Sequence, residues 1–151
     1  MTNINENNQT DWVAIPRYRK CFVCGADNDY GLQLSFEAKG DEVRTEWTPQ
    51  EKHCGYTHIV HGGVVAALLD EIMGWTGWLR YGRYYFTAES TIRYRKPVIA
   101  GRRYRAEARL INPREKIYFA EGRIIDEEGE VFAEATGKYF IRFDVGPEEY
   151  M

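Results

Sequence analysis

Hydrophobic residues fill one long segment of the chain and alternate with polar residues along most of the remainder. Residues 62–80 are apolar on nearly every side, and this pattern predicts a helix that is buried almost all round. Tyr81-Gly82 follows, and a glycine at that place is expected to end the helix. Alternation with a period of two predicts strands at 32–38, 41–48, 85–95, 104–110, 116–125 and 131–143.

The order of these elements is two strands, a long helix and four further strands. Because a single apolar helix must bury its surface against another layer, we expect an α+β domain in which one antiparallel sheet of five to six strands wraps around the helix. The 151 residues are enough for one such domain with a core. We place it at residues 20–143, after a flexible N-terminal lead-in at 1–19 and before a C-terminal tail at 144–151.

The candidate chemistry lies at His61-Gly62-Gly63 and at Asp70. A carboxylate on an apolar helix must find hydrogen-bond donors or raise its pKa, and either outcome suits a general base or a nucleophile. Backbone N–H groups at the start of the same helix, beside two glycines, are suited to polarise a carbonyl. The structural alternative is that His61 caps the helix, and that Asp70 and Glu71 mark a solvated edge.

Three further motifs accompany this segment. They are Cys21-Phe22-Val23-Cys24-Gly25 with Asn28 and Gly31-Leu32, Gly55-Tyr56-Thr57-His58-Ile59-Val60, and Arg93-Tyr94-Arg95-Lys96-Pro97-Val98. With them, the chain closely resembles the PaaI-like acyl-CoA thioesterases of the 4-hydroxybenzoyl-CoA thioesterase superfamily over residues 20–143. The resemblance implies the hotdog fold, in which the sheet wraps a central helix. It also implies hydrolysis of an acyl-CoA thioester to a free acid and CoA.

The resemblance also implies roles for individual residues. It places Asp70 in the catalytic position, as a base or as a nucleophile, and makes the backbone N–H of Gly62 the donor to the oxyanion. Thr87 is expected to help position water, although an ordinary strand residue would look the same. His61 is expected to orient the loop or the thioester. Glu71 is the reserve acid, because neighbouring helix residues point about 100° apart and only one should face the site.

The spacing of Gly62 and Asp70 predicts how the site is assembled. Their backbones lie about 12 Å apart along the helix, which is too far for one thioester carbonyl to meet both. Two antiparallel helices related by a twofold axis would bring Gly62 of one chain to Asp70 of the other. We therefore expect a homodimer with two composite sites, and the resembling enzymes build their sites in this way. A homotetramer, as a dimer of dimers, is left open.

Candidate substrate-binding residues flank this site. Gly63 is expected to let the substrate approach the helix, and Trp75 to line the acyl pocket. Basic residues cluster at one strand end and its following turn, where they offer charge-assisted partners for the CoA phosphates. These basic residues are Arg93, Arg95, Lys96, Arg102 and Arg103. An ordinary core position or a solvated surface explains each of these side chains equally well.

Charge and composition narrow the classes of partner. The formal net charge of -3 gives no global attraction to nucleic acid or to an anionic membrane. No segment reaches the length of a membrane span, and Met1–Thr10 lacks the pattern of a signal peptide, so we expect a cytoplasmic protein whose partners are the acyl-CoA substrate and copies of itself.

The cysteines raise the question of a metal. Cys21 and Cys24, with His53 and Cys54, are a conceivable set of zinc ligands. We expect no metal and no bound cofactor, since in the resembling family a segment of this form is the structured start of the first strand.

Two functions of other classes remain open. One is a hotdog protein that binds acyl-CoA as a sensor without hydrolysing it. The other is a hydratase or dehydratase of enoyl thioesters, for which His61 with Asp70 is the candidate pair.

Overall fold

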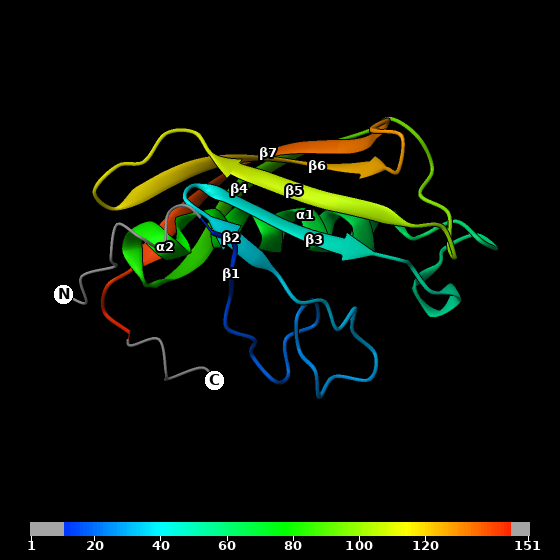
Figure 1. Cartoon of the computed structure of the whole chain (residues 1–151), viewed down its shortest axis with the longest axis horizontal. Coiled ribbons are helices and arrows are strands. Elements are labelled where there is room, and N and C mark those ends of the chain that lie inside the picture. The colour runs from blue at the N-terminus through cyan, green and yellow to red at the C-terminus, as the bar shows by residue number, and fades with distance from the viewer. Residues whose placement is uncertain (1–10, 146–151) are drawn as a thin grey trace.

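The computed structural model describes residues 11–145, in which one helix packs against a seven-stranded antiparallel sheet (Figure 1). The strand order is β1-β2-β3-β5-β6-β7-β4. The strands are β1 Val13–Ala14, β2 Glu37–Lys39, β3 Glu42–Trp47, β4 Tyr84–Tyr94, β5 Tyr104–Leu110, β6 Ile117–Asp126 and β7 Val131–Arg142. The helices are η2 Glu51–His53, α1 Gly62–Gly74, η3 Trp75–Gly77 and α2 Trp78–Tyr81. This arrangement confirms the predicted α+β hotdog architecture.

The central helix α1 owes its position to its apolar surface. Leu68, Leu69 and Ile72 are completely buried, and the strands opposite them carry small residues, including Ala106 and Ala120, that let the helix approach the sheet. The predicted helix at 62–80 is present, but it consists of α1, the tighter turn η3 and the short α2. It ends where expected, because Gly82 adopts the left-handed conformation with φ 59°.

The sheet has one strand more than the five to six that were predicted. The additional strand β1 pairs Val13 with Ala38 and Ala14 with Glu37. A strand of two residues is too short to show an alternation of polar and apolar positions, so the sequence pattern did not predict β1. Ile15 then enters the core at 4% exposed. The segment expected to be a flexible lead-in is thus held against the sheet from Val13 onward. The parts of the predicted termini at 1–10 and 146–151 lie outside the described residues.

Strand β4 forms one edge of the sheet, and among residues 11–145 it pairs with β7 alone. Its alternation predicted one buried face, yet in this chain Phe86 is 51% exposed and Tyr94 is 54% exposed. Tyr85 and Thr87 contact α1, so Phe86 between them lies on the opposite face. The register shift after Thr87 exchanges the faces, and Tyr94 at the end of the strand again contacts α1. As an edge strand, β4 is also unpaired along one side. Its unpaired backbone groups are available to another chain. Within residues 11–145, no helix is both long enough and apolar enough to span a membrane.

Candidate active site

Asp70 lies on α1 with its carboxylate held by two hydroxyl groups. Thr87 Oγ1 donates to Asp70 Oδ1 at 2.8 Å. The hydroxyl of Tyr139 lies 3.2 Å from the same Oδ1 and 3.0 Å from the main-chain oxygen of Asp70, so its single proton serves both acceptors. Oδ2 accepts no hydrogen bond from any residue that the structure describes. Oδ1 is therefore held in place by hydrogen bonds, and Oδ2 is free to accept a proton or to attack a substrate.

The two hydroxyl donors come from facing positions on paired strands. Thr87 of β4 and Tyr139 of β7 are register partners, and the register shifts by one residue immediately after Thr87. Such bulges commonly re-aim side chains near active sites. Gly137 makes room for the tyrosine ring, since a Cβ at that position would lie 2.7 Å from ring atoms of Tyr139. The local sequence thus places both hydroxyls under one turn of α1.

Tyr139 was missed in the sequence analysis, whereas Thr87 was a candidate. The alternation at 131–143 puts Tyr139 on the inward face. Which inward residue meets Asp70, however, depends on the strand register, and a single strand pattern does not reveal the register. Burial, followed by the charge of Asp70, raises the pKa of Tyr139 well above its usual range. The phenol therefore stays protonated and can act as a donor.

At the start of α1, the donors are nearly all used within the chain. His61 caps the helix, with Nδ1 accepting from the N–H of Gly63 at 2.8 Å. The N–H groups of Val64 and Val65 donate to the carbonyl oxygen of His61. The N–H of Gly62 has no hydrogen-bond acceptor within residues 11–145. The helix start therefore presents one exposed, unused donor at Gly62, and the structural role weighed for His61, a helix cap, is confirmed.

Tyr94 ties the end of β4 to this helix start. Its hydroxyl donates to the carbonyl oxygen of Gly62 at 2.9 Å, and its ring lies 3.5 Å from the place that a Cβ on Gly62 would occupy. Gly62 and Asp70 remain separated by two turns of α1. Within one chain, the structure does not bring these two groups together.

Glu71 and Asp70 have different partners, since neighbouring helix residues point about 100° apart. Its Oε1 lies 2.8 Å from Cys21 Sγ, in the loop between β1 and β2. Burial raises the pKa of Glu71 to about 9. The predicted reserve acid is therefore part of a separate buried cluster.

The predicted substrate-binding residues lie in different environments. Trp75 is 2% exposed and stacks on Tyr18 in the core. Arg95 forms an ion pair with Glu134, and Lys96 forms one with Glu130. Both basic residues directly follow Tyr94 and so lie close to the start of α1.

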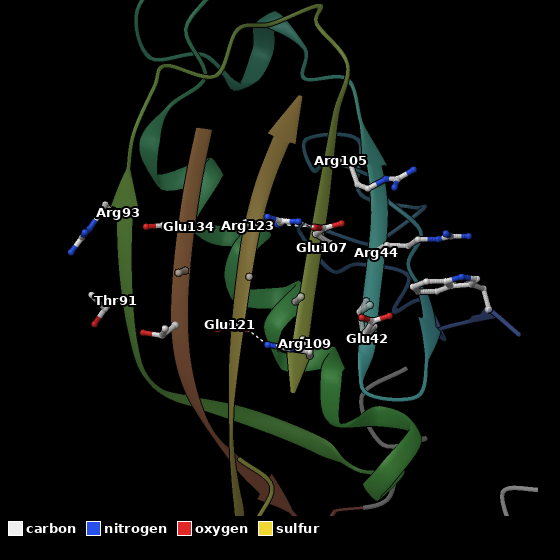
Figure 2. Close-up of a pocket in the computed structure, with 16 residues that line it drawn as sticks. Glu42, Arg44, Thr91, Arg93, Arg105, Glu107, Arg109, Glu121, Arg123 and Glu134 are labelled. Carbon is white, nitrogen blue, oxygen red and sulfur yellow. Dashed lines mark hydrogen bonds and ion pairs between the residues drawn. The ribbon is translucent and has the colours of Figure 1, made fainter. Parts of the chain in front are cut away.

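Arg93 lines a hollow of about 780 Å³ on the sheet (Figure 2). Figure 2 shows α1 behind the strands and the charged side chains in front of them, so the hollow lies on the face opposite the helix. Arginines and glutamates alternate across it and pair with each other, as Arg109 does with Glu121 at 2.6 Å. Neither Asp70 nor Gly62 lines the hollow. The positive and negative side chains of this hollow neutralise each other, and the hollow is separate from the candidate site.

The fold and this site define a hotdog protein that carries a carboxylate on its central helix. A family model described as the thioesterase superfamily matches residues 57–133, which is just over half of the 151 residues. The chain belongs to the thioesterase superfamily. A search of curated protein sequences gave no match.

Solved structures share the fold of this chain. A structure described as a thioesterase superfamily protein is 26% identical with a TM-score of 0.73, over 82% of this chain and 61% of that protein. The chain thus spans less than two thirds of that relative. The Escherichia coli PaaI protein, from the phenylacetic acid degradation operon, is 17% identical with a TM-score of 0.68, over 74% and 80% of the two chains. A hypothetical thioesterase protein of Streptococcus pneumoniae, solved with coenzyme A, is 21% identical with a TM-score of 0.62, over 66% and 80%.

Proposed function

We propose that this protein hydrolyses an acyl-CoA thioester to a free acid and CoA. Asp70 acts as general base or nucleophile through its free Oδ2, and the N–H of Gly62 stabilises the oxyanion. The observation that carries the proposal is the half-buried carboxylate of Asp70, which two strand hydroxyls orient through Oδ1 alone. Its second oxygen has no donor among the described residues, which leaves it able to accept a proton or to attack a carbonyl.

The proposed site is composite and requires a homodimer. Gly62 and Asp70 of one chain are too far apart to act on one carbonyl, whereas an antiparallel second α1 would place each group beside the other chain's partner. The exposed edge of β4 supports such a dimer because it offers eleven residues of strand for pairing between chains.

The observed geometry supports hydrolysis over the other functions considered. A hydratase would need His61 beside Asp70 over the acyl chain, but His61 caps the N-terminus of α1, two turns away from Asp70. A binding protein without activity would not need the oriented Asp70. We assign Trp75 no contact with substrate, because it is buried in the core.

Thiol release from a panel of short, medium, long and aromatic acyl-CoAs tests the proposed function. We expect the purified full chain to release free CoA from at least one class with saturation kinetics. Binding of acyl-CoA without any release would instead support the sensor function. If a folded dimer neither bound nor hydrolysed any acyl-CoA of the panel, this result would contradict the proposal.

Removing the Tyr139 hydroxyl should weaken catalysis without abolishing it. Tyr139→Phe is expected to lower kcat about tenfold with little change in KM, because it loosens the orientation of Asp70 but leaves the carboxylate in place. Tyr118→Phe is the matched control: it removes a buried hydroxyl that donates to the carbonyl oxygen of Gly74. Equal kcat values for the two variants would show that Tyr139 does not position Asp70.

The basic residues after β4 are proposed to bind the CoA phosphates. A double substitution, Arg95→Gln with Lys96→Gln, should raise KM for acyl-CoA about tenfold, or about 1.4 kcal/mol, at unchanged kcat. A short thioester that lacks the nucleotide should be hydrolysed equally by both proteins. Arg105→Gln, which breaks an ion pair with Glu46 elsewhere on the sheet, serves as control. A KM that rises equally for both substrates would exclude phosphate recognition by these residues.

A further inference from the structure

A cluster of potential metal ligands includes Glu71, the residue that follows Asp70 on α1. It consists of Cys21, Cys24 and Glu71, whose ligand atoms all lie within 4.8 Å of one another. The two cysteines belong to the loop between β1 and β2, which runs beneath α1 in Figure 1, and the glutamate belongs to α1. The cluster therefore joins two segments that are far apart in the sequence. None of its side chains is used in the proposed hydrolysis.

The backbone around the two cysteines is arranged to support a thiolate. The N–H of Cys24 donates to Cys21 Sγ at 3.3 Å. The N–H of Gly25 donates to the carbonyl oxygen of Cys21 at 2.9 Å and closes the turn. A Cβ at Gly25 would lie 2.5 Å from that oxygen, so only glycine fits. The N–H group aimed at the sulfur favours its charged form, which is the form that binds metals.

Glu71 completes the cluster with an oxygen that has no partner. Its Oε1 lies 2.8 Å from Cys21 Sγ, close enough for the two groups to share a proton. Its Oε2 is buried and has no hydrogen-bond donor among the described residues. A buried carboxylate oxygen without a partner is costly. A cation bound between the carboxylate and the sulfurs would satisfy it.

We propose that Cys21, Cys24 and Glu71 form a binding site for a zinc ion. Two thiolate sulfurs and one carboxylate oxygen of Glu71 provide three ligands, and a water molecule would complete the four that zinc prefers. Soft sulfur ligands select zinc over magnesium or calcium. The metal ties the loop between β1 and β2 to α1, one residue from Asp70, and so holds the helix in place.

This ligand set differs from the one considered from the sequence. His53 Nε2 is 2.9 Å from the carbonyl oxygen of Tyr30, and Cys54 Sγ is 3.9 Å from the carbonyl oxygen of Gln50. Neither belongs to the cluster around Cys21. The expectation that no metal binds rested on a family pattern for the cysteine segment, and Glu71 was not weighed as a third ligand.

Metal analysis and cobalt titration test the proposal. We expect the full chain, expressed in zinc-supplemented medium, to carry about one zinc per chain. After chelation under reducing conditions, added Co²⁺ should give a thiolate-to-cobalt charge-transfer band and the visible bands of a tetrahedral site. Binding should release protons, because thiols and carboxyl must give them up. Removing zinc should lower Tm, and returning it should restore Tm.

Matched variants make the result specific. Cys24→Ser and Glu71→Gln should each lower the affinity for Co²⁺ at least tenfold, whereas Cys54→Ser, which changes a cysteine outside the cluster, should not. Glu71→Gln keeps the shape of the side chain and carries the test if Cys24→Ser does not fold. The proposal would be overturned if reduced wild-type protein bound neither Zn²⁺ nor Co²⁺. This holds even if Cys21 and Cys24 are found to form a disulfide in air. Unchanged affinity in both variants would also overturn it. Neither outcome depends on thioesterase activity.

Discussion

Asp70→Asn is expected to lower kcat/KM for acyl-CoA hydrolysis at least about a hundredfold, a loss of about 2.7 kcal/mol of transition-state stabilisation. An amide neither accepts a proton from water nor attacks a thioester at a useful rate. The substitution keeps the size of the side chain and an oxygen that can accept from Thr87 and Tyr139, so the local packing is preserved. Initial rates of thiol release over a range of substrate concentrations provide the measurement.

Two controls separate a chemical loss from a structural one. Asp70→Asn should retain the wild-type circular dichroism spectrum and change Tm by only a few degrees, because it removes no packing atoms. Asp41→Asn, which changes a surface carboxylate that pairs with Arg80 at 3.5 Å, should keep full activity. If Asp70→Asn remains within a few-fold of wild type, the base or nucleophile is another residue and the proposed mechanism fails.

The sequence pattern predicted the elements well wherever the pattern was long. The helix at 62–80 and the five strands β3 to β7 have enough residues for a period to be read. The strand predicted at 32–38 is mostly wrong, because β2 spans only Glu37–Lys39 and residues 32–36 are not in a strand. β1 could not be predicted, because two residues define no period and because the pairing partner of Val13 lies at Ala38. The exposure of Phe86 also lay beyond the pattern: strict alternation puts Phe86 and Tyr94 on one face, but the register shift after Thr87 exchanges the two faces of β4.

The candidate site was predictable in its chemistry and less so in its supporting contacts. Asp70 stood out as a carboxylate on an apolar helix, and Thr87 was a candidate through resemblance. Tyr139 was not, since its contact with Asp70 spans 69 residues and depends on the register of β4 and β7. The contact between Cys21 and Glu71 spans 50 residues in the same way. Contacts between distant segments are set by tertiary packing, and local spacing does not encode them.

Gly62→Pro is expected to lower kcat about a hundredfold or more by deleting the proposed oxyanion donor. Proline is tolerated at the first position of a helix, where the missing N–H has no intrahelical partner. His61 has φ -57° and ψ 133°, which suits a residue that precedes proline. Gly62→Ala is the matched control because it keeps the N–H, and its Cβ would lie 3.5 Å from the Tyr94 ring, an ordinary contact. Steady-state kinetics on both variants, with Tm as a check on folding, give the measurement.

The two inactive variants together test whether the site spans two chains. In a heterodimer of one Asp70→Asn chain and one Gly62→Pro chain, one composite site combines the intact Gly62 of the first chain with the intact Asp70 of the second. The other site contains both lesions. A purified heterodimer, isolated through two different affinity tags, should therefore recover about half of the wild-type activity per dimer. If Gly62 and Asp70 acted within one chain, each chain would carry one lesion and the heterodimer would stay inactive. Recovery of activity from two inactive parents has no explanation within a single-chain site, whereas its absence from a stable heterodimer would contradict the composite site directly.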